Sequence, residues 1–160
     1  MAITGATMSF IPVFGFGSAV LTGILATSVA TQAAEPQEFE LRVEVSQLRN
    51  AKGVVHVCLT MDQANFPDCK SDARAHRLSV AASKAGELTF RHLASGTYAL
   101  SIIHDENGNG KLDTFAKIPR EGFGFSGNPP MRFGPPKFGE ASFTLTPGPN
   151  LQVVKMRYLL

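Results

Sequence analysis

Short segments in which apolar and polar residues alternate recur along the chain, and this pattern constrains the fold more than any other feature. The segments are 39–45, 54–61, 77–80, 87–90, 97–104, 141–145 and 151–158. A period of two places successive side chains on opposite faces of a strand, so each segment predicts a β-strand covered on one face. About seven such strands need an opposing apolar layer. The sequence therefore predicts an all-β sandwich, and a small closed barrel is the alternative.

The turns between these segments predict which strands pair. Residues 49–53 end in Gly53, so segments 39–45 and 54–61 are expected to form a β-hairpin. Two further turns are expected at residues 84–86 and 146–150. Residues 105–139, in contrast, are rich in Gly, Pro, Asn and Phe and show no sustained period, which predicts one long ordered loop.

The first 34 residues contain no Lys, Arg, Asp or Glu. An apolar stretch over residues 10–30 ends in small residues and precedes a polar run, which is typical of a secretory signal peptide. We therefore predict a signal peptide over residues 1–34 and a β-sandwich domain over residues 35–160. A permanent N-terminal anchor is the alternative, because the apolar stretch is about long enough to span a bilayer. Cleavage predicts a periplasmic or secreted protein without stable membrane insertion.

Cys58 and Cys69 are the two cysteines of the chain. In an exported protein an even pair predicts a disulfide, here one that closes a short loop, and two free thiols are the alternative. The charge of the chain identifies no partner. Its 15 basic and 13 acidic residues are too evenly balanced to indicate nucleic acid or an anionic membrane surface.

Residues 105–113 are similar to the first part of a calcium-binding loop. The candidate ligands recur at alternate positions, where Lys111 would contribute its backbone carbonyl and the others their side chains: Asp105, Asn107, Asn109, Lys111 and Asp113. Ala116 stands where an EF-hand loop carries a bidentate Glu, so an EF-hand is excluded. A looser Ca²⁺ site of modest affinity is one interpretation. In the other, the Asp and Asn side chains cap their own turns without an ion.

A second group of candidate residues lies in and beside the Gly-Phe-Pro stretch that follows. Phenylalanines that alternate with glycines can present their rings on one side, as a platform for a sugar, a peptide or a partner strand. The candidate binding surface consists of His104, Arg120, Glu121, Phe123, Phe125 and Phe133. In the alternative interpretation the phenylalanines pack onto the sandwich, and Arg120 and Glu121 fix the ends of the loop.

Catalytic signatures were sought in the sequence and not found. The histidines lack metal-ligand spacing, and neither a Gly-x-Ser-x-Gly elbow nor a P-loop occurs. Asp105 and Glu121 could form a carboxylate pair, which would make the protein a small glycan-active enzyme. We expect instead a protein without catalytic residues.

The motifs after residue 96, taken in order, resemble a known family. Gly-Thr-Tyr-Ala at 96–99 is followed by HDENGNGKLD at 104–113, IPREGFGFS at 118–126 and FGPPKF at 133–138. This ordered set is similar to an uncharacterised family of bacterial exported proteins, domain of unknown function 2141. The resemblance implies a secreted or periplasmic protein with an immunoglobulin-like or transthyretin-like β-sandwich. It implies no activity, substrate or catalytic residue.

Two hypotheses about function follow. In the first, the protein is an exported binding or accessory module. Its acidic-amide loop and its Gly-Phe-Pro loop would meet at one end of the sandwich and bind an envelope protein or a small ligand, with Ca²⁺ ordering that surface. In the second, it is a structural or assembly protein of the cell envelope that pairs with a partner through its edge strands.

Overall fold

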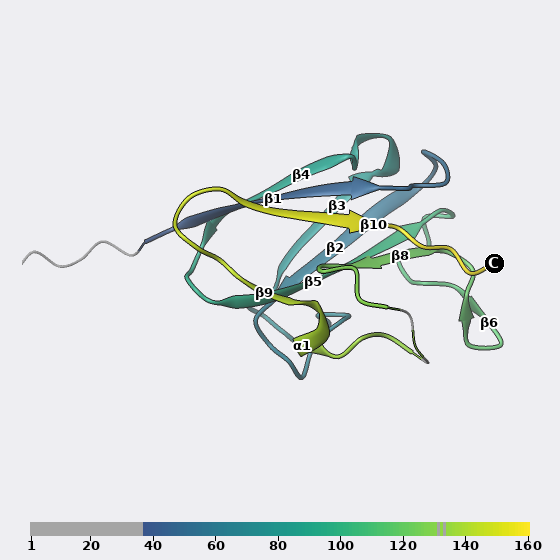
Figure 1. Cartoon of the computed structure of the whole chain (residues 1–160). Coiled ribbons are helices and arrows are strands. Elements are labelled where there is room, and N and C mark those ends of the chain that lie inside the picture. The colour runs from purple at the N-terminus through teal and green to yellow at the C-terminus, as the bar shows by residue number, and fades with distance from the viewer. Residues whose placement is uncertain (1–36, 131, 133) are drawn as a thin grey trace, which may run out of the picture. The chain divides into compact units, whose positions relative to one another are not determined.

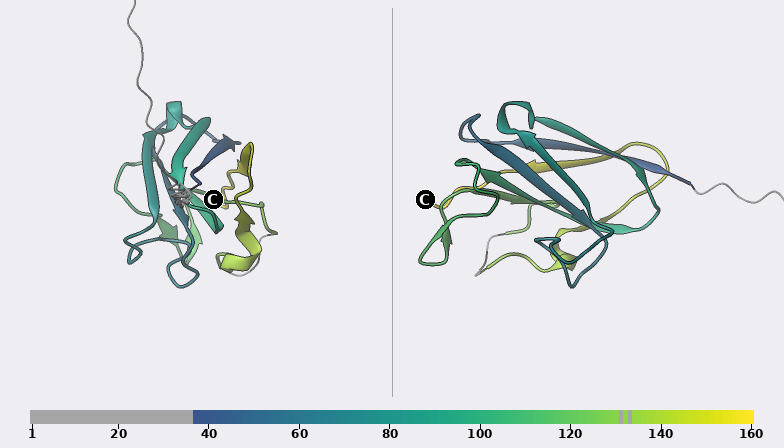
Figure 2. Two further views of the ribbon diagram at one scale, coloured as in Figure 1. Left: turned by 90° about the vertical axis from the view of Figure 1, so that its left-hand side faces the viewer. Right: turned by 180° about the vertical axis from the view of Figure 1, so that it is seen from behind.

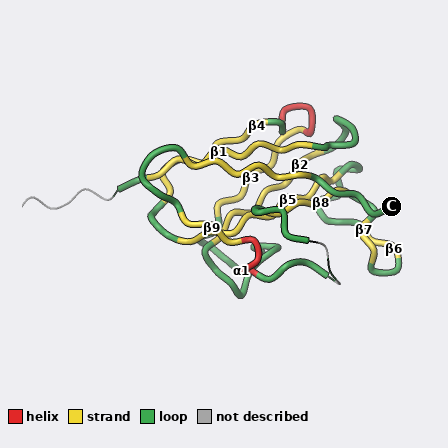
Figure 3. Tube along the Cα trace, in the orientation of Figure 1, coloured by secondary structure: helices red, strands yellow, loops and turns green. Residues whose placement is uncertain are grey.

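The computed structural model describes residues 37–160 except 131 and 133. The predicted signal peptide over residues 1–34 lies outside the described residues. Among the residues described, almost all regular structure is β, as Figure 3 shows, with only the 3₁₀ turn Ala82–Lys84 and the short helix α1 (Phe138–Ala141) as exceptions. In that part of the chain, no helix has the length and apolar character needed to cross a membrane.

One layer of the domain is a three-stranded sheet. Its order is β10 (Asn150–Lys155), β1 (Phe39–Ser46) and β4 (Glu87–Leu93), as Figure 1 shows. The central strand β1 runs parallel to β10 and antiparallel to β4. The first and last strands of the domain therefore lie side by side.

The second layer is a five-stranded sheet. Its main path is β3 (His76–Ala81), β2 (Val54–Thr60), β5 (Thr97–Asp105) and β8 (Gly122–Phe125), with all neighbours antiparallel. The fifth strand, β9 (Ser142–Thr144), pairs with the first part of β5, while β8 pairs with the later part. A separate two-stranded hairpin consists of β6 (Thr114–Phe115) and β7 (Ile118–Pro119).

The core lies between the two sheets. It is formed by alternate residues of the strands, such as Leu41 and Val43 from β1 and Leu59, Leu100 and Ile102 from the facing sheet. Each side chain of this size stabilises the fold by about 1.5–3 kcal/mol when it is fully removed from water. The predicted all-β sandwich is thus confirmed. The apolar residues whose alternation predicted the strands are the residues that form the core.

The predicted hairpin between residues 39–45 and 54–61 is wrong. β1 and β2 belong to different sheets, so the turn between them crosses from one layer to the other. Gly53 ends that turn at a φ of 71°, and an added Cβ would lie 2.0 Å from the carbonyl oxygen of Asp105. The chain also crosses between layers from β3 to β4, from β4 to β5 and from β9 to β10, which can be followed in Figure 2.

Residues 105–139 do not form one long loop, because β6, β7 and β8 lie within them. In β8 the inward positions are glycines. An added Cβ would lie 2.5 Å from the Tyr158 ring at Gly122 and 2.6 Å from Val154 Cγ1 at Gly124. The core therefore leaves no room for side chains there, and a strand with glycines on its inner face shows no apolar alternation.

Candidate functional site

The outer face of the five-stranded sheet carries two complete cross-strand rows of side chains. In each row the residues are directly paired in register along β3, β2, β5 and β8. The first row is Ser79, His56, Ile103 and Phe123, and the second is Arg77, Cys58, Ser101 and Phe125. Because neighbouring strands are about 4.8 Å apart, the rows span roughly 14 Å across the sheet.

These two rows form the floor of a groove with a volume of about 930 Å³. Protein sites for small ligands usually have volumes of roughly 300–1,000 Å³, so the groove is large enough for one. Its walls come from the two ends of the sheet. The loop after β2 contributes Pro67, Asp68 and Lys70, and the segment between β5 and β8 contributes residues 110–112 and the β6–β7 hairpin. These two segments lie at opposite ends of β5 in Figures 1 and 2.

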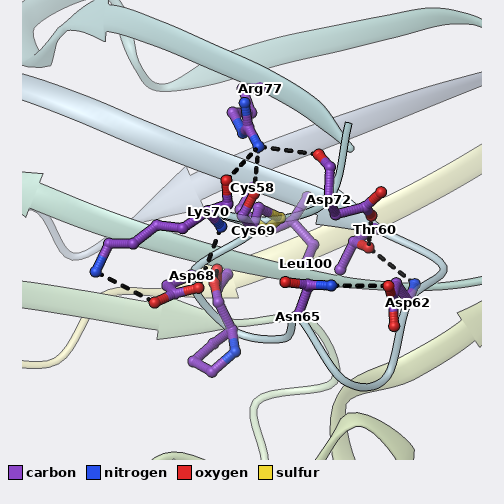
Figure 4. Close-up of a disulfide and its surroundings, with 12 residues drawn as sticks. Cys58, Thr60, Asp62, Asn65, Asp68, Cys69, Lys70, Asp72, Arg77 and Leu100 are labelled. Atoms are coloured by element: carbon purple, nitrogen blue, oxygen red, sulfur yellow. Dashed lines mark hydrogen bonds and ion pairs between the residues drawn. A yellow bond between two sulfur atoms is a disulfide. The ribbon is translucent and has the colours of Figure 1, made fainter. Parts of the chain in front are cut away.

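A disulfide holds the first wall against the floor. Cys58 of the second row is bonded to Cys69, with their Cα atoms 6.0 Å apart, which confirms the predicted pair. Arg77 of the same row donates from Nη2 to the carbonyl oxygens of Cys69 and Asp72, as Figure 4 shows. The loop is thus attached to the sheet by a covalent bond and by an arginine whose partners here are backbone carbonyls.

A buried hydrogen bond closes the same loop from inside. Asp72 is 6% exposed, and its carboxylate accepts a hydrogen bond of 2.5 Å from the Thr60 hydroxyl (Figure 4). This bond, together with the backbone N–H of Arg74, holds the pKa of Asp72 below its ordinary value. The carbonyl of Pro67 accepts a hydrogen bond from Ser101 on the floor. The first wall is therefore fixed at several points.

Asp105 organises the second wall. Its side chain is fully buried, and its two oxygens accept backbone N–H groups from the loop that follows: Gly108 at 2.7 Å, Asn109 at 3.1 Å and Gly110 at 2.6 Å. Burial by itself raises the pKa of Asp105, but these hydrogen bonds and His56 together hold it below its ordinary value. The loop is therefore folded around a charged carboxylate.

Glu121 ties the two ends of the same segment together. Its Oε1 accepts the backbone N–H of Glu106 and its Oε2 accepts that of Asp113, both at 3.0 Å. Arg49 pairs with the carboxylate of Glu106, and this hydrogen bond is the main reason that the pKa of Glu106 lies below its ordinary value. The Arg49 guanidinium also stacks on the Tyr158 ring, with its Cζ atom 4.5 Å from the ring centre. The second wall is thus anchored to the sandwich.

The five proposed metal ligands lie together in this loop, but side-chain oxygens of four of them, Asp105, Asn107, Asn109 and Asp113, already accept hydrogen bonds within the loop. Asn107 Oδ1 accepts from the backbone of Asn109, and Asn109 Oδ1 accepts from the backbone of Lys111. Asp113 Oδ2 accepts from the side-chain amides of Asn107 and Asn109 at 2.7 and 2.9 Å. The described residues contain no group of three or more His, Cys, Asp or Glu arranged to hold a metal. The Ca²⁺ site stays a prediction.

The six residues of the predicted binding surface do not share one surface. Phe123 and Phe125 lie on the groove floor, although each is less than a tenth exposed. His104 is buried on the inner face, where Nε2 donates to the Lys52 carbonyl and Nδ1 faces the Tyr158 hydroxyl, each at 2.7 Å. Glu121 is buried as well, and Arg120 is exposed away from the groove. Phe133 lies outside the described residues.

The phenylalanines of β8 form a small second core on the outer face. Phe123 and Phe125 pack together with Ala99 and Ala141, and Phe66 and Phe138 cover them partly. The Phe66 ring lies 6.0 Å from both Phe125 and Phe138. The rings thus pack onto the sandwich, as one of the two interpretations of the sequence has it, and only a small part of their surface is exposed in the groove.

His56 is the functional candidate that the sequence did not reveal. Its Nδ1 lies 2.8 Å from the Ser79 hydroxyl and its Nε2 lies 3.4 Å from Asp105 Oδ2. In a hydrolase triad the serine contacts Nε2 and the aspartate contacts Nδ1, so the ring stands the other way round here. Ser79 and Asp105 are far from His56 in the sequence, and only the register of three strands brings them together.

Charge is unevenly distributed around the groove. Five of the lining residues are basic and one, Asp68, is acidic, whereas the whole chain has 15 basic and 13 acidic residues. Asp68 pairs with Lys70 at 3.2 Å. The groove thus combines apolar side chains on part of its floor with an excess of positive charge among the residues that line it.

Comparisons with known proteins give one match. A family model described as an uncharacterized protein conserved in bacteria (DUF2141) matches residues 43–152, which is more than half of the chain. The curated proteins and the solved structures give no match to the chain. The matched residues include every residue that lines the groove except Leu159. The chain therefore belongs to this bacterial family of uncharacterized proteins (DUF2141).

Proposed function

We propose that this protein is a small exported binding module whose ligand site is the groove on the outer face of the five-stranded sheet. The observation that carries the proposal is the groove itself, whose floor consists of the two rows and whose two walls are fixed. The outer face has half-buried Ile103 at its centre. The apolar surface of this side chain stays in contact with water, which is unfavourable, unless something covers it. A ligand that lies on Ile103 and against the hairpin residue Ile118 would cover it.

The fixed walls support a binding role because they reduce the cost of ordering a site. The disulfide at one end and the Asp105 hydrogen bonds at the other hold their loops before any ligand arrives. A site that is already ordered loses less conformational freedom on binding. Both walls belong to loops, which is where binding residues usually gather on a rigid β scaffold.

The disulfide also supports a location outside the cytoplasm. Disulfides form and persist in oxidising compartments such as the bacterial periplasm. The uncharged, apolar leader over residues 1–34 is the sequence feature that fits export. We therefore assign the module to the periplasm or the exterior of the cell.

Assembly through edge strands is the second candidate. The outer edge of β3 has no strand partner among the described residues, so it could accept a strand from another protein. The edge of β10 is less available, because the Asn128 side chain bridges the Val153 carbonyl and the Lys155 N–H at 2.7 and 2.8 Å. Replacement of Ala81 by Pro would test the β3 edge: a self-associated or partner-bound form should disappear while the fold is retained.

The groove proposal is tested with phenylnaphthylamine, a neutral apolar fluorophore. We expect saturable enhancement of its fluorescence, with one probe bound per folded chain. Ile103→Gln and Ile118→Ser should each weaken binding several-fold, because each removes apolar surface from the groove. Leu151→Gln is the matched control, since Leu151 is a similarly exposed apolar residue on the other sheet. Absence of saturable binding, or equal effects of all three variants, would contradict the proposal.

A further inference from the structure

The chemistry of the groove narrows the class of its ligand, and this inference rests on the binding function proposed above. The floor offers one aliphatic and two aromatic side chains in adjacent positions, Ile103, Phe123 and Phe125. Ile118 adds an exposed aliphatic side chain on the hairpin wall. A ligand that fits this surface has a flexible apolar part and needs few hydrogen bonds along it.

The groove is also lined by five basic residues. Of the basic residues around the groove, Lys70 pairs with Asp68, whereas Arg77, Lys111, Lys117 and Arg132 form no ion pair among the described residues. The hydrogen bonds of Arg77 go to neutral carbonyls, and the nearby Asp72 carboxylate offsets part of its charge. Lys111 lies near the Asp113 carboxylate, which offsets part of its charge. An excess of basic residues beside the apolar side chains of Ile103, Phe123 and Phe125 is complementary to an anion at one end of an apolar chain.

We propose that the groove binds a free anionic amphiphile of the fatty-acid class. The acyl chain lies across the sheet over Ile103 and the exposed parts of Phe123 and Phe125. The carboxylate of the ligand faces the second wall, where Lys111 and Lys117 lie. The groove is open to solvent at its rim, so the head group keeps part of its hydration while the chain is covered.

The test compares decanoate with decan-1-ol, which has the same chain and no charge. Both are measured by displacement of bound phenylnaphthylamine from the full domain, below the concentration at which decanoate aggregates. Exposed ion pairs are weak individually, so we expect decanoate to bind about three- to tenfold more tightly than decan-1-ol at low salt. Added NaCl should remove most of this preference by screening and leave the affinity for decan-1-ol unchanged.

A charge variant with a matched control locates the head group. Lys111→Gln combined with Lys117→Gln should abolish the preference for decanoate and keep the affinity for decan-1-ol. Lys84→Gln combined with Lys155→Gln removes the same net charge from exposed positions outside the groove and should leave the preference intact. If both double variants reduce the preference equally, a general field of positive charge explains it and the proposed head-group position is wrong.

The remaining outcomes separate this inference from the binding function. If phenylnaphthylamine binds but decanoate binds no more tightly than decan-1-ol, the groove is a ligand site and the proposed fatty-acid class is wrong. If neither probe binds, both proposals fail. The last experiment uses vesicles of anionic phospholipid. The inference is overturned if the protein binds these vesicles, Phe115→Ser abolishes that binding, and decanoate does not displace the probe. The exposed hairpin would then be a membrane contact.

Discussion

His56 on the groove floor lies 3.4 Å from Asp105, measured from Nε2 to Oδ2. The contact joins the centre of the five-stranded sheet to the carboxylate around which the second wall folds. Floor and wall are therefore not independent. A change at Asp105 is expected to act on the groove through the loop and through the histidine together.

Asp105→Asn should destabilise the protein and loosen the second wall. An amide keeps one acceptor oxygen but places an NH₂ group against N–H donors, so we expect a loss of about 2–3 kcal/mol in the free energy of unfolding. Chemical denaturation measures it. Asp113→Asn is the control, because the Asp113 carboxylate accepts only side-chain amides and is partly exposed, so its loss of stability should be much smaller than that of Asp105→Asn. Equal losses would contradict the role given to Asp105.

The same carboxylate predicts a pH dependence. Because the pKa of Asp105 is below its ordinary value of 3.8 in the folded protein, its contribution to stability is complete above that value. The contribution is lost as the pH falls through the folded pKa. Other acids with lowered pKa values, such as Asp72 and Glu106, add to the loss in the same direction.

Denaturation curves of the wild type and Asp105→Asn from pH 7 to pH 2 isolate this contribution. The difference in stability between the two proteins should be constant at neutral pH and should shrink only below about pH 4. A difference that already shrinks between pH 7 and pH 5 would show that Asp105 does not carry the lowered pKa.

Removal of the disulfide should affect the first wall more than the sandwich core. Replacement of both Cys58 and Cys69 by serine should lower the free energy of unfolding by roughly 2–3 kcal/mol, as expected for a short closed loop. Thermal denaturation with and without reductant gives the same comparison in the wild type. Hydrogen exchange should increase in residues 61–75 while the β1 amides stay protected. Exchange that increases equally in both sheets would argue that the disulfide supports the whole fold.

The Ca²⁺ prediction is tested on chelator-treated protein. The loop already satisfies its oxygens with its own N–H groups, so Ca²⁺ would have to displace those donors. We therefore expect millimolar CaCl₂ to leave the melting temperature unchanged. A saturable rise in melting temperature that Asp113→Ala removes would establish the metal site instead.

The sequence predicted most strands of this fold and their buried faces, because alternation reports directly which face of a strand is buried. Segments 39–45 and 54–61 are both strands, and the cysteines pair. Alternation carries no information about the partner of a strand. A turn that ends in Gly53 serves a hairpin and a crossing between sheets equally well, so the pairing was mispredicted.

The groove could not be predicted for a related reason. Its rows depend on the register of β3, β2, β5 and β8, which depends on contacts between residues far apart in the chain. β8 was missed because glycines occupy its inner positions. The acidic-amide loop was located correctly, and the reading in which Asp105 caps its own turn agrees with its hydrogen bonds.

The most direct test of the central claim is a map of ligand contacts on the folded chain. The amide NMR spectrum of the domain, titrated with phenylnaphthylamine, should change at saturation for residues of the two floor rows and of the walls. Shifts should centre on Ile103 and extend to His56 and the β6–β7 hairpin, with the three-stranded sheet unaffected. Shifts confined to the three-stranded sheet, or spread over the domain without saturation, would contradict a ligand site on this face.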